Sequence, residues 1–317
     1  MAKLVVFDAG EVASQLSIKD CIPLVRQAMI ALSDGSARQL LRSFISMGDG
    51  RTFAQMPAAL GTQSWFGAKL VSVFADPANP GHKAHKGLVI LFDGPSGDPV
   101  CVADAGEVTR IRTAATTALA TDVLARKDAS ILTIMGAGLQ AKAHIEAIHL
   151  VRNLTEIRVW ARNAARAQEL AQELDSKALP VRAVAEARAA VTGADIVCTV
   201  TSSPTAVLLG DWVGPGTHVN LVGSSAPVPV ETDSALVVKS RFIADHREHV
   251  LAHGAEFLTA KRAGLVGDEH VVGEIGEVLL GKIPGRQNAE QVTVYKSLGH
   301  AVQDLAALAW LYEQSRR

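Results

Sequence analysis

The 317-residue sequence has few aromatic residues, only three cysteines and almost no net charge. Eight Phe, four Trp and two Tyr make up 4% of the chain, so the core has to be built from aliphatic side chains and alanine. Cys21, Cys101 and Cys198 are odd in number and far apart, which argues against a disulfide framework and a structural zinc site. Lys and Arg number 31 against 32 Asp and Glu, which excludes a strongly basic nucleic-acid-binding protein and an acidic disordered tail.

Long hydrophobic runs are also missing. No stretch reaches the roughly 18 apolar residues that a membrane span needs, and the first residues, MAKLVVFDAGEV, lack the apolar run of a signal peptide. We therefore expect a soluble, cytoplasmic protein with no membrane partner. At roughly 100–200 residues per domain, the length predicts two domains, which can bury a core without a metal or disulfides.

The first third of the chain is predicted to be a mixed α+β domain, covering residues 1–115. Helical spacing of apolar residues predicts a helix over 18–33, closed by Asp34-Gly35. Strand-like runs follow, separated by Pro- and Gly-rich turns, at 43–47, 67–74 and 87–93. An Ala- and Thr-rich helix over 107–125 then leads into the next domain.

From residue 116 to 294 the pattern changes to alternating apolar strands and helices, which predicts a parallel sheet with right-handed crossovers. The expected strands are 130–135, 157–160, 181–184, 194–200 and 217–223, with a helix over 164–174 among the connections. This sheet looks complete without the end of the chain. Residues 295–317 are predicted to be one amphipathic helix that returns to the first domain.

A glycine motif stands between the first strand and the first helix of this second domain. The sequence Gly136-Ala-Gly138-Leu-Gln-Ala141 fits G-x-G-x-x-A in that position. Gly136 allows the tight turn, Gly138 lets the backbone approach a pyrophosphate, and Ala141 keeps helix and strand close. The motif alone is weak evidence for nucleotide binding, because an ordinary glycine turn can have the same sequence. In this context it predicts a Rossmann-type, doubly wound α/β sheet that binds a dinucleotide.

The end of the second strand bears on which dinucleotide is bound. A carboxylate at this place binds the ribose 2′-hydroxyl of NAD, but the sequence here reads Arg162-Asn163, with Arg166 one turn later. Guanidinium groups match the geometry of a 2′-phosphate. The alternative is that both arginines are ordinary surface residues. We predict NADPH as the cofactor, with NADH less favoured.

Three cations of the first domain stand in apolar surroundings: Arg42, Lys69 and Arg112. A buried cation is costly unless its charge is paired. Taken singly, each is explained by surface exposure or by pairing with an internal carboxylate. Taken together, they suggest a pocket for the carboxylate of a substrate. Asp304, on the final helix, either faces such a site or is an exposed helix residue.

These segments resemble the ornithine cyclodeaminase/μ-crystallin family over essentially the whole chain. The resemblance is carried, in order, by Met56-Pro-Ala, GAKLVSVFADPANPG, GLVILFDGPSGDPV, GEVTRIRTAATTALAT, GAGLQA, ADIVCTVTSS, GEIGEVLLGKIPGR and VYKSLGHAVQDLAAL. It implies a homodimer built through the first domain, which also binds the substrate, followed by a Rossmann domain.

The resemblance also implies roles for individual residues. In this family the positions of Arg42, Lys69 and Arg112 bind the α-carboxylate of an amino or imino acid. Met56 is also expected to bind the substrate. The dinucleotide is expected at His85, Arg112, Thr113, Gly136, Ala137, Gly138, Leu139, Gln140, Ala141, Arg162, Asn163, Arg166, Thr199, Val200, Thr201, Val222, Ser224, Ser297 and Gly299.

One departure separates the branches of this family. Ornithine cyclodeaminases carry an Asp in the loop after the strand THVNLVG, and Ser225 occupies its position here. Serine is not a good general base near neutral pH. The μ-crystallin-like ketimine reductases resemble this loop more closely, with Ser there and Arg residues after the second strand.

We therefore expect an NADPH-dependent reductase of cyclic imino acids, converting Δ1-pyrroline-2-carboxylate to L-proline or Δ1-piperidine-2-carboxylate to L-pipecolate. Lys69 is the candidate proton donor, and Ser225 the candidate partner of the ring nitrogen. The alternatives are an ornithine cyclodeaminase or alanine-dehydrogenase-like oxidoreductase, and a μ-crystallin-like NADPH- or ligand-binding protein without turnover. No metal is expected. His246, His249 and His253 are interpreted as surface residues of a helix.

Overall fold

The computed structural model describes residues 4–75, 83–228 and 230–317, with the side chains of 75 and 83–85 outside that description. The chain divides into two compact units. The first consists of residues 1–115 together with His300–Arg317, and the second of Thr116–Gly299. The long helix α3 (Ala105–Leu124) belongs to the first unit up to residue 115 and to the second from residue 116.

The first unit is built on a seven-stranded sheet with the order β1-β7-β6-β5-β4-β2, and β3 pairs with β4 outside this path. Most neighbours are antiparallel, with β1 parallel to β7. The strands are β1 (Val5–Phe7), β2 (Arg38–Gln39), β3 (Ser43–Ser46), β4 (Thr52–Ala59), β5 (Phe66–Ala75), β6 (Lys83–Phe92) and β7 (Pro99–Asp104).

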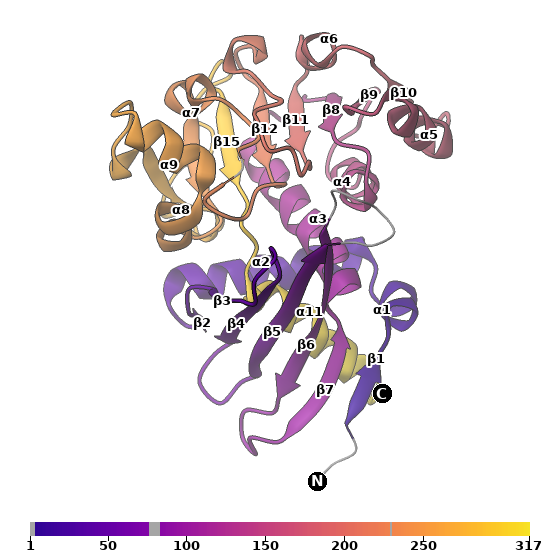
Figure 1. Cartoon of the computed structure of the whole chain (residues 1–317), viewed down its shortest axis with the longest axis vertical. Coiled ribbons are helices and arrows are strands. Elements are labelled where there is room, and N and C mark those ends of the chain that lie inside the picture. Colours follow the sequence, from indigo (N-terminus) through magenta and orange to yellow (C-terminus); the bar gives the residue numbers. More distant parts are fainter. Residues whose placement is uncertain (1–3, 76–82, 229) are drawn as a thin grey trace. The chain divides into compact units, whose positions relative to one another are not determined.

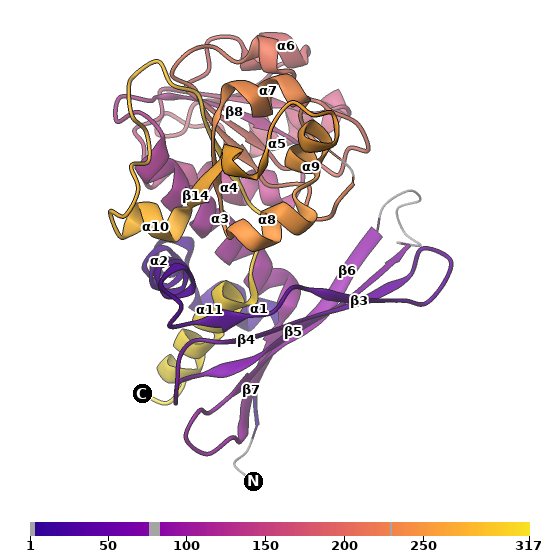
Figure 2. The same cartoon turned by 90° about the vertical axis from the view of Figure 1, so that its left-hand side faces the viewer.

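The helices of this unit are α1 (Ala9–Gln15), α2 (Ile18–Asp34) and α11 (Ala301–Gln314), besides the first half of α3. Ser17 caps the start of α2 by accepting a hydrogen bond from the Asp20 amide, and Gly35 ends it in the left-handed conformation with φ of 82°. Figure 2 shows α2 and α11 on one side of the sheet.

The two faces of this sheet have different surroundings. Strand residues alternate between the faces, so Val89 and Leu91 point to the same side as Lys69 and are fully buried. Leu305 of α11 covers that side beside Gly67. Val6 and Leu88 point to the other side and are 61% and 51% exposed. One face of the sheet is therefore packed, and the other presents apolar side chains to solvent.

The second unit contains an eight-stranded parallel sheet with the order β10-β9-β8-β11-β12-β15-β13-β14 (Figure 1). Its first five strands follow the 3-2-1-4-5 order of a dinucleotide-binding sheet. The predicted fold class, a Rossmann-type sheet with a second α+β domain, is thus confirmed. The strands are β8 (Ile131–Met135), β9 (Glu156–Trp160), β10 (Val181–Ala183), β11 (Ile196–Thr199), β12 (His218–Leu221), β13 (Arg241–Ala244), β14 (Val271–Glu274) and β15 (Thr293–Lys296).

Helices connect these strands, and most are short. Aliphatic residues of β8, β9 and β11 pack against α4 and α5 in one core cluster, in keeping with the low aromatic content. The helices of the unit, apart from the end of α3, are α4 (Leu139–His149), α5 (Ala164–Leu174), α6 (Ala187–Val191), α7 (Ser234–Lys239), α8 (Arg247–His253), α9 (Ala255–Arg262) and α10 (Ile275–Leu279), with 3-10 turns at Gly210–Trp212 and Asp268–His270.

The prediction of one helix over 295–317 is wrong at its start. Residues Thr293–Lys296 form β15, which inserts between β12 and β13, so the predicted sheet was incomplete without it. The helix begins only at Ala301, after Gly299 turns the chain with φ of 78°. Tyr295, Leu298 and Val302 have helical spacing in the sequence, but the strand's hydrogen bonds to both neighbours decide its conformation.

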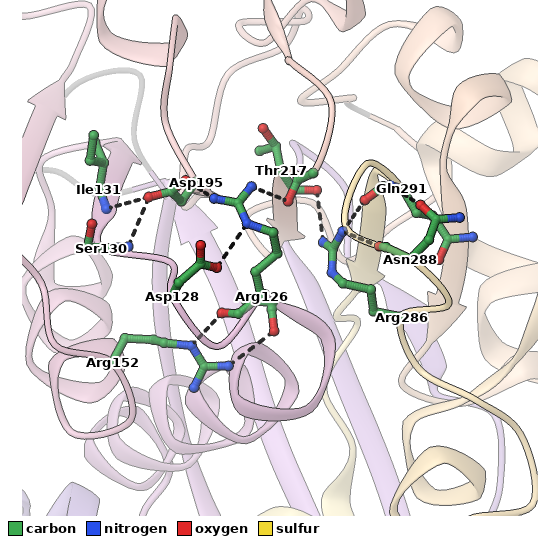
Figure 3. Close-up of polar contacts among 12 residues, drawn as sticks. Arg126, Asp128, Ser130, Ile131, Arg152, Asp195, Thr217, Arg286, Asn288 and Gln291 are labelled. Atoms are coloured by element: carbon green, nitrogen blue, oxygen red, sulfur yellow. Dashed lines mark hydrogen bonds and ion pairs between the residues drawn. The ribbon is translucent and has the colours of Figure 1, made fainter.

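Arginine side chains form hydrogen bonds with backbone carbonyl groups at the amino end of the parallel sheet (Figure 3). Arg152 donates to the carbonyl groups of Thr121 and Ala125 and Arg286 to that of Leu124, so two guanidinium groups satisfy the last carbonyls of α3. Asp195 accepts hydrogen bonds from the amides of Ser130 and Ile131 at 2.9 and 3.0 Å, and joins the start of β11 to that of β8.

The interpretation of the three histidines as surface residues is wrong for His249, which is 1% exposed on α8. His246 and His253 are half-buried at the two ends of that helix. Within the described ranges, no group of three or more His, Cys, Asp or Glu side chains is placed to hold a metal ion. In the same part of the chain, none of the helices has the length and apolarity needed to cross a bilayer.

Candidate active site

Lys69 and Arg112 converge on one buried carboxylate in the first unit. Lys69 on β5 lies 3.3 Å from Asp304 Oδ1 through its Nζ, and Arg112 on α3 lies 3.0 Å from the same oxygen through its Nε. Asp304 is fully buried, and the cations are 6% and 4% exposed. Of the two alternatives left open for Asp304, exposure on the helix is therefore excluded.

The surroundings of Lys69 make it a weaker base than an ordinary lysine. Burial lowers the pKa of Lys69 to about 8; Asp304 opposes this shift, and the positive charges of Arg112 and Arg42 add to it. Its Nζ also donates to the hydroxyl of Thr109, which itself donates to the carbonyl of Ala105. A lysine with this pKa can give up a proton near neutral pH.

The cluster holds more positive charge than its own carboxylate balances. Two buried cations face Asp304, and Asp304 Oδ2 is buried without a hydrogen-bond partner among the described residues. Gln303 accepts from Arg112 Nη1 at 2.7 Å but adds no charge. Since buried cations need compensation, the arrangement fits an additional anion with a group that can donate to Asp304.

The remaining predicted residues of this unit lie on neighbouring elements. Arg42 is half-buried in the loop before β3, and its charge acts on Lys69. Met56 is buried on β4, in register with Lys69 on β5. Thr113 is buried next to Arg112 on α3, and its hydroxyl has no hydrogen-bond partner in the described part of the chain. The side chain of His85 lies outside the described residues.

In the second unit, the glycine motif lies at the point where the strand order reverses. Gly136 follows β8, and a Cβ on it would stand 2.9 Å from the carbonyl oxygen of Val200, which follows β11. Its φ of 131° also disfavours any other residue. Ligands of open parallel sheets bind at the carboxyl ends of strands flanking such a switch point.

The start of α4 is open to a ligand. A Cβ on Gly138 would meet no atom within 4 Å, and no side chain caps the helix, so the amides of Leu139 and Gln140 are available to an external acceptor. Ala137 is half-buried, and Leu139 is 78% exposed beside Gln140. Ala141 is fully buried against the sheet. These features fit the pyrophosphate of a dinucleotide.

Arg162 and Arg166 are exposed near the carboxyl end of β9. Asn163 between them caps α5: its side-chain oxygen accepts hydrogen bonds from the amides of Ala165 and Arg166 at 3.1 and 3.4 Å. This cap fixes where α5 begins, and therefore the backbone positions from which the Arg162 and Arg166 side chains extend.

Buried charges that the sequence did not indicate hold the other predicted dinucleotide positions. Glu231 accepts hydrogen bonds from the hydroxyls of Thr199 and Thr201, and Lys296 donates to the carbonyl of Ser224 at 2.7 Å. Asp245 Oδ2 accepts from the amides of Leu298 and Gly299, next to Ser297. Val200, Val222 and Ser225 are half-buried in the same loops. Asp245 directly follows the short apolar run 242–244, which was not predicted as a strand and was the available signal, whereas Glu231 had none.

Residues 3–317 match the model of the ornithine cyclodeaminase/mu-crystallin family. The chain belongs to this family. The match extends over both units, so the predicted membership of the family is confirmed over essentially the whole chain.

Curated and solved relatives cover nearly the full length. The ketimine reductase mu-crystallin of Mus musculus is 33% identical over 296 residues, which are 92% of this chain and 91% of the relative. The Δ1-pyrroline-2-carboxylate reductase of Thermococcus litoralis, solved with NADH and L-proline, is 30% identical with a TM-score of 0.93, covering 99% of this chain and 98% of its own. An archaeal alanine dehydrogenase dimer with bound NAD is 28% identical with a TM-score of 0.92, covering 99% and 96%.

Proposed function

We propose that the protein is a nicotinamide-dependent reductase of cyclic imino acids, with Δ1-pyrroline-2-carboxylate as the preferred substrate and Δ1-piperidine-2-carboxylate as the second. The observation that carries this proposal is the buried cluster in which Lys69 and Arg112 face a single carboxylate, Asp304. A substrate carboxylate balances the excess positive charge. The relatives named as ketimine and pyrroline-2-carboxylate reductases support the same reaction class.

The residues of the first unit would bind and protonate the substrate. Arg112 and Arg42 would hold the carboxylate, and Met56 would contact the apolar ring. The C=N bond accepts a hydride readily only when its nitrogen is protonated. Lys69, whose pKa burial lowers to about 8, is the proposed proton donor, and Asp304 would accept a hydrogen bond from the ring N–H. Ser225, which belongs to the second unit, is the proposed second contact to the ring nitrogen.

The residues of the second unit would hold the cofactor, which when bound supplies the hydride for the imine carbon. The open start of α4, from Gly136 to Ala141, would bind the pyrophosphate. Other proposed contacts of this unit are Thr199, Val200, Thr201, Val222, Ser224, Ser297 and Gly299, and Thr113 is the one proposed from the first unit.

We also propose a preference for NADPH over NADH. Arg162 and Arg166 are exposed, and no hydrogen bond or ion pair occupies either guanidinium group within the described part of the chain. Both are therefore available to a 2′-phosphate, which guanidinium groups bind well. The Thermococcus litoralis reductase was solved with NADH and the archaeal alanine dehydrogenase with NAD, so the preference for NADPH rests on these two arginines.

The loss of NADPH absorbance with purified protein and Δ1-pyrroline-2-carboxylate tests the reaction. Parallel samples contain NADH in place of NADPH, or L-ornithine with NAD. Fast oxidation of NADPH and slower oxidation of NADH are expected. Release of ammonia from ornithine would instead support cyclodeaminase chemistry. Binding of NADPH without turnover of either imine would support a carrier of the mu-crystallin kind.

The uncovered sheet face of the first unit supports a homodimer, which we propose as the assembled form. Apolar side chains on this face include Val6, Phe66, Phe74 and Leu88, each at least 37% exposed. Several large apolar side chains exposed on one sheet face are typical of an interaction surface. Leu88→Lys should convert the dimer into a monomer in analytical ultracentrifugation. The control Val238→Lys, at an exposed position of the second unit, should leave the sedimentation unchanged.

A further inference from the structure

Glu231 joins two loops of the second unit through both of its carboxylate oxygens. Oε2 accepts hydrogen bonds from the Thr199 hydroxyl at 2.7 Å and the Gly223 amide at 2.6 Å. Oε1 accepts from the amide and the hydroxyl of Thr201, at 2.7 and 2.8 Å. Glu231 is fully buried, and the loops it joins follow β11 and β12. One side chain thus satisfies four donors from two loops.

The two loops approach each other closely at this place. A Cβ on Gly223 would stand 2.1 Å from the Thr201 carbonyl oxygen and 2.4 Å from Glu231 Oε1. Only glycine fits beside the carboxylate and the neighbouring backbone. The distance between the loops is therefore set by Glu231 and Gly223 together.

A second buried ion pair, between Glu256 and Lys296, contacts the backbone of Glu231 and of Ser224. Glu256 Oε1 accepts a hydrogen bond from the Glu231 amide at 3.1 Å, and its Oε2 forms an ion pair with Lys296 Nζ at 2.8 Å. Lys296 in turn donates to the Ser224 carbonyl. All three charged side chains are at most 1% exposed. The loop after β12 is thus held at Gly223 by Glu231 and at Ser224 by Lys296.

We infer that Glu231 is a positioning residue for the nicotinamide cofactor, because it fixes the loops containing Thr199–Thr201 and Val222–Ser224 in one arrangement. The inference rests on the proposed function, in which these loops contact the cofactor. Glu231 does not itself touch substrate or cofactor in this assignment. Its effect is to remove the freedom of two loops before binding, so that no binding energy is lost in ordering them.

The amide of glutamine cannot replace this carboxylate. An amide has one acceptor oxygen, and its nitrogen only donates. Whichever way the group is oriented, its NH2 faces either the Gly223 N–H or the Thr201 N–H. One backbone donor is then left unsatisfied, which a buried N–H does not tolerate without a shift of the loop.

The experiment compares Glu231→Gln with Asp195→Asn. Asp195 is the matched control, since its carboxylate also joins two strands of this sheet through backbone amides, but at the amino end (Figure 3). Both variants should lower the melting temperature. The dissociation constant of NADPH, measured by its fluorescence, should rise about tenfold or more for Glu231→Gln and less than twofold for Asp195→Asn.

An unchanged NADPH affinity in Glu231→Gln, with a lowered melting temperature, would overturn the inference and leave Glu231 a purely structural residue. Hydrogen exchange gives a readout that needs no cofactor. The Thr201 and Gly223 amides should exchange faster in Glu231→Gln, and equal protection would also contradict the inference.

If the wild-type protein binds neither NADPH nor NADH, the proposed function fails, whereas the exchange rates still decide whether Glu231 fixes the loops. Should Glu231→Gln not fold, Glu231→Asp, which retains the charge, replaces it with the same expectations.

Discussion

Each of the two units buries a carboxylate, Asp304 in the first and Glu231 in the second, and the two differ in how many of their oxygens accept hydrogen bonds. In the first unit, Lys69 and Arg112 share one oxygen of Asp304, and the other oxygen has no hydrogen-bond partner among the described residues. In the second unit, each oxygen of Glu231 accepts two hydrogen bonds, and Lys296 pairs with Glu256.

This difference indicates which cluster binds a ligand. A buried polar group without a partner costs free energy, and a binding site is where a protein retains that cost. The Asp304 cluster therefore has an acceptor left for the proposed substrate, whereas the Glu231 carboxylate is fully used by its own loops. Substitutions at the first cluster should change the rate of the reaction. Substitutions at the second should make the two loops less rigid and so weaken cofactor binding.

Lys69→Met should have the largest effect. The thioether keeps much of the volume but removes the proton donor, so kcat for Δ1-pyrroline-2-carboxylate should fall about 10²–10⁴-fold. NADPH affinity should stay within twofold, because the cofactor contacts are unchanged. The control Lys127→Met removes an exposed lysine of the second unit and should leave turnover unaffected. Near-wild-type turnover of Lys69→Met would exclude Lys69 as the donor.

Asp304→Asn should shift the pH dependence of the reaction. Lys69 donates only when protonated, so wild-type kcat should be constant at low pH and fall as pH rises through about 8. Asp304 raises the pKa of Lys69, so its removal should move that fall to lower pH. At pH 8 the variant should be several-fold slower, and at pH 6 closer to the wild type.

The control for this shift is Glu107→Gln, which removes a carboxylate of the same unit that pairs with Arg110 instead. Its pH profile should coincide with that of the wild type. A profile of Asp304→Asn that is lowered equally at every pH would mean that Asp304 orients the substrate without acting on the proton of Lys69.

Much of the fold followed from the sequence, because its signals are local. Alternating apolar strands, the glycine turn at Gly136 and helical spacing over 164–174 each depend on neighbours in the chain. The error at 295–317 has the opposite origin. The segment Thr293–Lys296 is a strand because β12 and β13 hydrogen-bond to it from both sides, and no local pattern records those partners.

The charged residues that the sequence singles out also depend on local signals. Lys69 and Arg112 stood out because each is a charge in an apolar run. Glu231 did not, because it lies outside every predicted strand and helix, and its role depends on donors 8 to 32 residues away. Asp304 was left undecided since a single Asp on a helix fits both surface and interior. Long-range pairing of charges is what the sequence alone does not reveal.

The smallest effect is expected at the exposed arginines of the second unit. Arg162→Ala and Arg166→Ala should each raise KM for NADPH by about fivefold to tenfold, since exposed charge pairs contribute little individually. KM for NADH should not change, because NADH has no 2′-phosphate. The control Arg182→Ala removes an exposed arginine that is already paired with Glu156 and should alter neither value. Equal losses with both cofactors would mean that the arginines act through the stability of α5 rather than on the phosphate. Added salt should reduce the NADPH preference of the wild type, because solvent-exposed contacts with a phosphate are screened.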